Sequence, residues 1–174
     1  LNSGTDALHL ALRALDIGAG DEVITTAFTF VATTEAIGIV GAKPIFADID
    51  PDTFNLDYKD IESKITPRTK AIIPVHLYGQ PANMVEIMKI AKKYNLYVIE
   101  DCCQAIGATY KGKKVGTFGD IYQYGLYSTA ITELATTSGV KLINIDGELR
   151  DPFGKLKNVF QMTEKEFFMQ KNDF

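Results

Sequence analysis

Apolar and polar residues follow two recurring patterns along the chain. Segments with apolar residues at helical spacing favour α-helices, and they cover residues 6–15, 30–40, 57–65 and 84–94. Shorter runs of continuous apolar character favour β-strands, and they cover residues 22–25, 44–47, 71–75, 97–100 and 121–127. Polar or glycine-containing turns separate these segments, for example at 18–21 and 111–114.

The order of these elements predicts the fold class. Helices and strands alternate, and the strands are apolar on both sides, which is typical of βαβ units in which the sheet is buried on both faces. We therefore expect an α/β fold with a mostly parallel sheet and helices on both faces. Residues 1–145 form this core, without internal repeats or linkers. Residues 146–174 predict a degenerate tail, weakly structured or forming a docking helix, because a Pro-Gly break at 151–154 precedes only a short helical pattern.

Charge and cysteine content exclude several classes of partner. The net charge of −4 provides no basic field for nucleic acid, and no apolar run is long enough to span a bilayer. The first residues do not resemble a signal peptide. Cys102 and Cys103 are adjacent, so we expect neither a disulfide between them nor a zinc site. These features predict a cytoplasmic protein.

Three features are expected beyond the carboxyl ends of the parallel strands, where ligands bind in such sheets. Gly4, Thr5 and Asp6 open a helix whose backbone N–H groups and positive dipole end suit a phosphate. Asp101 follows the strand Tyr-Val-Ile-Glu directly and places a carboxylate at the same edge. An aromatic pair, Phe28 and Phe30, begins a helix just after a strand, where an aromatic face can cover a flat ring.

Each feature also has a structural explanation. Residues such as Ser3 and Thr5 are preferred helix caps and serve more often as caps than as phosphate ligands. Phenylalanine is usually buried, so Phe28 and Phe30 fit core positions as well. Asp101 can equally cap a following helix. The order of motifs along the chain favours the ligand-binding roles over these structural explanations.

The motifs form one ordered series between Ser3 and about Asp120. It consists of Ser-Gly-Thr-Asp-Ala-Leu, Gly-Asp-Glu-Val-Ile-Thr, Phe-Thr-Phe-Val-Ala-Thr, Gly-Ala-Lys-Pro-Ile-Phe-Ala-Asp-Ile-Asp, Pro-Val-His-Leu-Tyr-Gly-Gln, Val-Ile-Glu-Asp and Gly-Thr-Phe-Gly-Asp. The series resembles the DegT/DnrJ/EryC1/StrS family of nucleotide-sugar aminotransferases, which depend on pyridoxal phosphate (PLP). The resemblance implies an incomplete large domain of PLP-transferase fold type I. It also implies a homodimer that transfers an amine from glutamate or glutamine to a keto group of a nucleotide-linked sugar.

The resemblance assigns roles by position. The helix start at 4–6 would hold the cofactor phosphate, and Phe30 would stack on the pyridine ring. Asp101 would pair with the protonated pyridine nitrogen, which keeps the ring an effective electron sink. Gln104 matches the position beside the ring hydroxyl. His76 and Tyr78 lie in a loop that borders the family's site, although a hydrogen-bonded role at a strand end explains His76 equally well.

The chain departs from the family where the catalytic lysine is expected. That lysine binds PLP covalently and moves the proton between the two carbons that exchange the amine. Counted forward without gaps from Asp120, its position holds Ala130. Counted back from the run Val-Lys-Leu-Ile-Asn-Ile-Asp at 140–146, it holds Thr132. Lys141 lies past this loop on an expected strand, so we do not expect it to substitute.

Further departures follow in the tail. The run at 160–164 resembles the family's Asn-Tyr-Arg-Met-Thr-Glu motif, but Val159 and Gln161 replace the asparagine and the arginine. The small C-terminal domain and the segment that precedes Ser-Gly-Thr in the family are expected to be absent. Three hypotheses follow: an aminotransferase in fragment or variant form, a non-catalytic relative that binds PLP or a sugar nucleotide without turnover, and a truncated product with no site.

Overall fold

The structure, a computed structural model, describes residues 3–123, which lie in the first of the two units into which the chain divides, Leu1–Leu126. Its helices are α1 (Gly4–Ala14), α2 (Val31–Ile39), α3 (Tyr58–Lys64) and α4 (Met84–Tyr94), with a short 3-10 helix, η1, at Leu77–Gly79. Its strands are β1 (Glu22–Thr26), β2 (Lys43–Ala47), β3 (Thr69–Ile72), β4 (Tyr97–Asp101), β5 (Thr109–Tyr110), β6 (Lys113–Lys114) and β7 (Ile121–Gln123).

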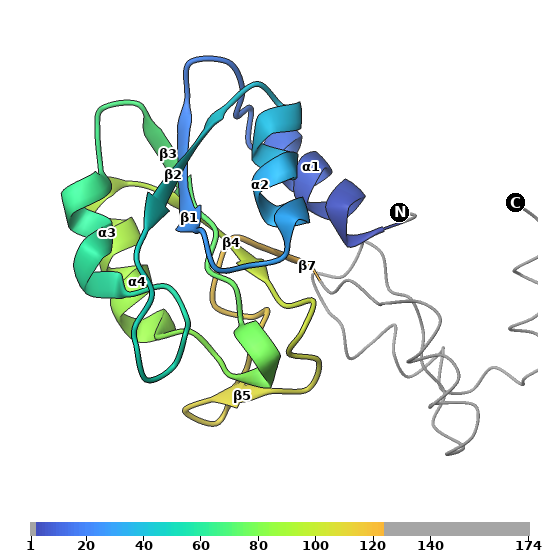
Figure 1. The fold of residues 1–174 in the computed structure, drawn as a ribbon, viewed down its shortest axis with the longest axis vertical. Helices are drawn as coiled ribbons and strands as arrows, with labels where there is room; N and C mark the ends of the chain where they lie inside the picture. The colour runs from blue at the N-terminus through green and yellow to red at the C-terminus, as the bar shows by residue number, and fades with distance from the viewer. Residues whose placement is uncertain (1–2, 124–174) are drawn as a thin grey trace, which may run out of the picture. The chain divides into compact units, whose positions relative to one another are not determined.

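Five of these strands form one parallel sheet. Their order is β2-β1-β3-β4-β7, and each neighbouring pair runs in the same direction. Helices α1 and α2 cover one face of the sheet, and α3 and α4 cover the other (Figure 1). The expected mostly parallel sheet with helices on both faces is therefore confirmed. Because the strands are parallel, their carboxyl ends line one edge of the sheet. This edge runs across the strands and differs from the outermost strands, β2 and β7.

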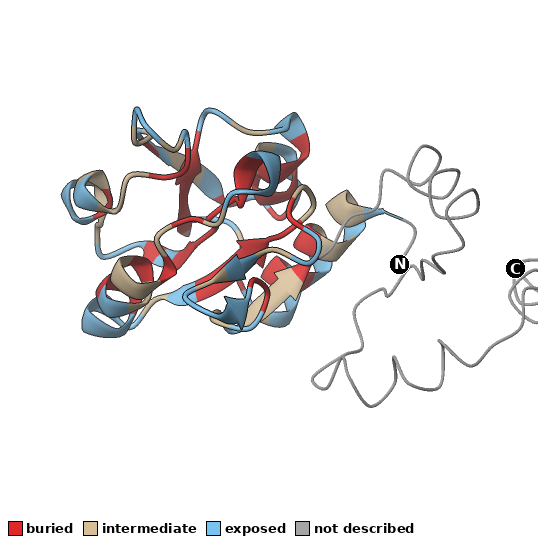
Figure 2. Ribbon diagram, turned by 90° about the horizontal axis from the view of Figure 1, so that it is seen from below, coloured by how far each residue is buried: buried red, intermediate tan, exposed pale blue. Residues whose placement is uncertain are grey.

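Two apolar cores flank the sheet, and Figure 2 shows its central strands as mostly buried. The core beneath α1 and α2 includes Leu8, Leu12, Val23, Ile37, Ile73 and Ile99. The core beneath α3 and α4 includes Ile24, Ile61, Ile72, Met84, Ile87 and Val98. Neighbours along a strand, such as Val98 and Ile99, point to opposite cores. This is why the strand segments are apolar without alternation.

Local sequence explains where the helices begin and end. Ser3 caps α1, because its Oγ accepts a hydrogen bond from the backbone N–H of Asp6 at 3.1 Å. The expected helix at 84–94 is α4, with the same bounds, and Asn95 ends it in the left-handed conformation at φ 54°. Asp57 caps α3 by accepting a hydrogen bond from the N–H of Lys59.

Three expectations need correction. The segment 44–47 is not a buried strand, since within β2 only Ala47 is buried, and β2 lies at the edge of the described sheet. The strand expected at 71–75 ends as β3 at Ile72, because Pro74 has no N–H for a ladder. The turn at 111–114 belongs to a hairpin of β5 and β6, whose strands are too short to show periodicity.

Some expectations fall outside residues 3–123. These are the end of the strand expected at 121–127, the boundary at 145, the tail at 146–174, and positions 130 and 132. Within the described residues, no helix has the length and apolar character needed to cross a membrane. Cys102 and Cys103 are not joined by a disulfide, as expected.

Candidate functional site

The carboxylate of Asp101 lies at the carboxyl end of β4 and is 4% exposed. Its Oδ2 accepts a hydrogen bond from the Thr33 hydroxyl at 2.9 Å. Its Oδ1 accepts one from Nε2 of Gln123 at 2.9 Å and one from the backbone N–H of Cys103 at 3.2 Å. Three donors from different segments therefore fix the orientation of this carboxylate.

Parallel strand order brings these donors together. In the ladder between β4 and β7, Asp101 lies opposite Gln123, so two strand ends supply the acceptor and one donor. Thr33 lies in the first turn of α2, which follows β1, and its hydroxyl is also 3.2 Å from that of Thr29. The chain after Asp101 forms a turn and not a helix, so the helix-cap alternative for Asp101 is wrong.

The two phenylalanines before α2 are exposed. Phe30 is the N-cap residue of α2 and is 53% exposed. Phe28 is also exposed, and its ring lies 6.0 Å from that of Phe54, tilted by 40°. The alternative that Phe28 and Phe30 belong to the core is therefore wrong. An exposed aromatic ring offers a flat apolar face of the kind that can cover a planar ligand.

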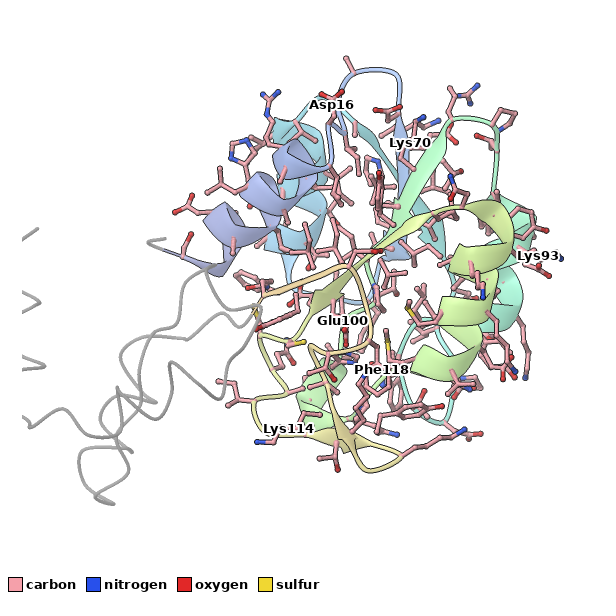
Figure 3. The ribbon with its side chains drawn as sticks, turned by 180° about the vertical axis from the view of Figure 1, so that it is seen from behind. Asp16, Lys70, Lys93, Glu100, Lys114 and Phe118 are labelled. Atoms are coloured by element: carbon pink, nitrogen blue, oxygen red, sulfur yellow. The ribbon has the colours of Figure 1, made fainter. Side chains whose placement is uncertain are left out.

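The first turn of α1 lies near the same sheet edge. Helix α1 packs against α2 and contacts β4 and β7, and Figures 1 and 3 both show its first turn beside the end of β7. The N–H of Asp6 is engaged by the Ser3 cap. Gly4 and Thr5 are the first helical residues, so their N–H groups have no acceptor within the helix. Residues from both ends of the described chain thus meet at one edge.

Gln104 tethers the loop that contains η1. Its Oε1 accepts a hydrogen bond from the backbone N–H of Tyr78 at 3.0 Å. Tyr78 adopts a left-handed conformation at φ 53°, and its side chain is exposed. The amide nitrogen of Gln104 is the group that would remain to bind a ring hydroxyl. The roles proposed in cofactor binding stay predictions for all six residues, Gly4, Thr5, Asp6, Phe30, Asp101 and Gln104.

His76 is buried and forms a closed pair with Glu100. Its Nδ1 accepts the N–H of Ala82 at 3.0 Å, so the ring proton is on Nε2, which donates to Glu100 Oε2 at 3.1 Å. Both ring nitrogens are therefore used within the protein, and His76 is not exposed. The hydrogen-bonded structural role for His76 is confirmed.

The carboxylate of Glu100 is saturated with donors. Besides His76, it accepts the backbone N–H groups of Gly116, Phe118 and Gly119 at 2.6–2.8 Å, and Figure 3 shows Glu100 near Phe118. Burial alone would raise the pKa of Glu100, but the hydrogen bonds from His76 and the three backbone groups outweigh it and lower the pKa below its ordinary value.

The same cluster resembles a metal site in composition only. Ligand atoms of His76, Glu100 and Cys102 lie within 4.8 Å of one another. However, the nitrogens of His76 and both oxygens of Glu100 already have protein partners. Burial raises the pKa of the Cys102 thiol, which disfavours the thiolate that a metal requires. Glu100 therefore joins the loop that contains His76 to the loop at residues 116–119.

Residues 1–172 match the profile of the DegT/DnrJ/EryC1/StrS aminotransferase family. The chain belongs to this family. A UDP-N-acetyl-3-dehydro-alpha-D-glucosamine 3-aminotransferase from Acidithiobacillus ferrooxidans is 53% identical over 156 residues, 90% of this chain and 42% of the relative. A GDP-perosamine synthase from Caulobacter vibrioides is 48% identical over 85% of this chain and 39% of the relative. The chain thus spans about two fifths of these family members.

Solved structures of family members agree with the fold. NtdA from Bacillus subtilis, solved with bound cofactor PMP, is 49% identical, with a TM-score of 0.66 over 70% of this chain and 27% of that chain. The described residues are accordingly part of a fold-type-I large domain. The resemblance proposed from the ordered motifs is confirmed.

Sequence motifs did not single out two residues that hold Asp101. Thr33 lies within the motif Phe-Thr-Phe-Val-Ala-Thr, but the motif does not indicate which of its hydroxyls turns inward. Gln123 ends the strand next to β4, and polar residues at neighbouring parallel strand ends are the signal that would have found it. Finding it required the strand order, which sequence periodicity does not provide.

Proposed function

We propose that this chain is the cofactor-binding part of a PLP-dependent aminotransferase of nucleotide-sugar biosynthesis. The reaction would transfer an amine from glutamate or glutamine to a keto sugar carried on a nucleotide. The observation that carries the proposal is the buried carboxylate of Asp101, oriented by three donors at the strand edge near the first turn of α1. The two relatives named for sugar chemistry support this substrate class.

The residues at this edge fit the chemical groups of PLP. The phosphate would lie at the start of α1, where Gly4 and Thr5 offer backbone N–H groups and the helix dipole favours negative charge. The exposed ring of Phe30 would cover the pyridine ring. Asp101 would accept a hydrogen bond from the protonated ring nitrogen, and Gln104 would donate to the ring hydroxyl. Bound PLP supplies an electron sink for the carbon that carries the amine.

Each protein group has a separate part in this scheme. Asp101 keeps a proton on the ring nitrogen, because a nearby carboxylate favours the charged form of a base. Thr33 keeps the carboxylate aimed at the ring, and the Glu100–His76 pair holds the loops on either side of β4. None of these groups moves the proton between the two carbons that exchange the amine.

The lysine position decides between catalysis and binding. Both alignments place a residue without an amino group there, Ala130 or Thr132. A hydroxyl or methyl group cannot bind PLP covalently or shuttle the proton. We therefore propose that this chain holds PLP or its amine form, PMP, without completing transamination. Pairing as a homodimer and a cytoplasmic location remain part of the proposal.

Restoring a lysine tests both the function and the alignment. Ala130→Lys and Thr132→Lys are each incubated with PLP, reduced with borohydride and analysed by peptide mass spectrometry. We expect one of the two to retain PLP at the substituted position, because one of the two alignments places the family's PLP-binding lysine there. The unmodified chain, treated identically, controls for non-specific labelling of surface lysines. Labelling of both variants only at the surface, as in this control, would contradict the proposed function.

A further inference from the structure

We propose that Gln123 is a positioning residue that occupies Oδ1 of Asp101 and thereby directs the cofactor's ring-nitrogen proton to Oδ2. This inference rests on the proposed function, because it assigns an atom to the contact between Asp101 and the pyridine ring. It concerns a residue at the end of β7 that the motif comparison left without a role.

The count of hydrogen bonds at Asp101 assigns the receiving atom. A carboxylate offers about four acceptor positions, two on each oxygen. Oδ1 accepts from Gln123 and from the backbone of Cys103, which fills both of its positions. Oδ2 accepts only from Thr33 among the described residues. The acceptor position that remains for a further donor is therefore on Oδ2.

The orientation of the Gln123 amide is fixed by its neighbours. Its Nε2 lies 2.9 Å from Asp101 Oδ1 and 2.7 Å from Cys103 Sγ, so both amide hydrogens face acceptors. Rotating the amide by half a turn would place Oε1 against the carboxylate, oxygen against oxygen, where no proton is available. The nitrogen must therefore face Asp101.

This orientation leaves Oε1 of Gln123 buried without a hydrogen-bond donor among the described residues. The side chain is 4% exposed, so solvent does not satisfy this oxygen. A buried oxygen without a donor weakens the folded state. Gln123 therefore does not have the contacts expected of a residue selected for stability alone, whereas its contact with Asp101 is well formed.

The test uses the full chain and PMP labelled with ¹⁵N in the ring. Gln123→Met keeps the length of the side chain but removes both the donor and the unpaired oxygen. Gln80→Met is the matched control, because the Gln80 side chain is exposed and the hydrogen bonds that Gln80 forms with Leu77 and Asn55 involve only its backbone. For each protein, NMR follows the ring-nitrogen signal of bound PMP with pH, and thermal melting reports on stability.

We expect Gln123→Met to lower the pH at which the bound ring nitrogen loses its proton by about one unit, and to weaken PMP binding roughly tenfold, because Gln123 no longer holds the Asp101 carboxylate with Oδ2 toward the ring and the charge-assisted contact is weakened. Its melting temperature should stay close to that of the parent, because removing the unpaired buried oxygen offsets the loss of the hydrogen bond to Asp101. The control should match the parent in both measurements.

Three other outcomes would overturn the inference, and they are distinguishable. If the parent binds PMP and Gln123→Met shows the same protonation midpoint, Gln123 does not position Asp101, although the proposed function stands. A lower melting temperature with an unchanged midpoint would show that Gln123 serves only stability. If the parent itself gives no signal from bound PMP, the proposed function fails, and this inference fails with it.

Discussion

Two neighbouring carboxylates, Glu100 and Asp101, have different roles because they meet different partners. Both are buried at the end of β4. Glu100 accepts four hydrogen bonds and has no acceptor position left. Asp101 accepts three from the described residues, which leaves one position on Oδ2. Saturation makes Glu100 a structural group, whereas the remaining position supports the proposal that Asp101 binds a ligand.

Removing the charge of Glu100 should destabilise the fold. In Glu100→Gln the amide nitrogen must replace either Oε1, which faces Phe118 and Gly119, or Oε2, which faces His76 and Gly116. Either orientation sets donors against donors. We expect the free energy of unfolding at pH 7 to fall by about 3 kcal/mol. Urea unfolding measures this, and Glu86→Gln, at a half-buried helical glutamate that pairs with the exposed Lys89, is the control.

The same variant predicts a pH dependence. Because the pKa of Glu100 is lowered in the folded protein, its contribution is present in full above the ordinary value of about 4.5. The contribution is lost as the pH falls through the lowered folded-state pKa. The stability difference between the parent and Glu100→Gln should therefore be constant near neutral pH and shrink in acid. A difference that grows below pH 4.5 would contradict this assignment.

The sequence predicted some residues of the site better than others. Asp101 was found because a carboxylate directly after a buried strand is visible in the sequence. Gln123 and Thr33 were missed because their contacts with Asp101 join residues 22 and 68 positions apart, and strand order alone brings them together. The role of His76 was left open, because the sequence does not show that its two ring nitrogens bond Glu100 and Ala82.

Among the elements, those with strong local signals were predicted most accurately. Helix α4 has apolar periodicity and an Asn at its end, and its predicted bounds are the observed ones. Strand β2 was wrongly predicted as buried, because an apolar run does not distinguish an edge strand from a central one. The hairpin of β5 and β6 consists of two-residue strands, which have too few positions to show a period.

The approach of the loop before β7 to β4 can be tested with a glycine pair. A Cβ at Gly119 would lie 2.6 Å from the carbonyl oxygen of Val98, which is backbone and cannot rotate away, whereas nothing lies within 4 Å of a Cβ at Gly38 in α2. We expect Gly119→Ala to lower the free energy of unfolding by about 3 kcal/mol. Gly38→Ala should raise it by up to about 1 kcal/mol. Urea unfolding of both variants compares them, and equal effects would contradict the described loop position.

At the scale of the whole molecule, the parallel sheet explains how distant residues form one site. The first turn of α1, the N-cap of α2 and the ends of β4 and β7 lie at one edge because every described strand of the main sheet points the same way. The chain nevertheless spans about two fifths of its curated relatives, so substrate specificity remains a proposal.

The most direct test of the central claim is a titration of the full chain with PMP, followed by cofactor fluorescence, for the parent, Asp101→Asn and Asp50→Asn. Asp50 lies in a turn where its carboxylate accepts hydrogen bonds from Asp52 and Thr53, so Asp50→Asn controls for loss of an acidic group elsewhere. We predict saturable binding by the parent and by Asp50→Asn, and at least roughly tenfold weaker binding by Asp101→Asn, because the ring nitrogen loses its charged partner. Equal affinity of all three proteins, or no saturable binding by the parent, would contradict the claim that Asp101 and α1 form a cofactor site.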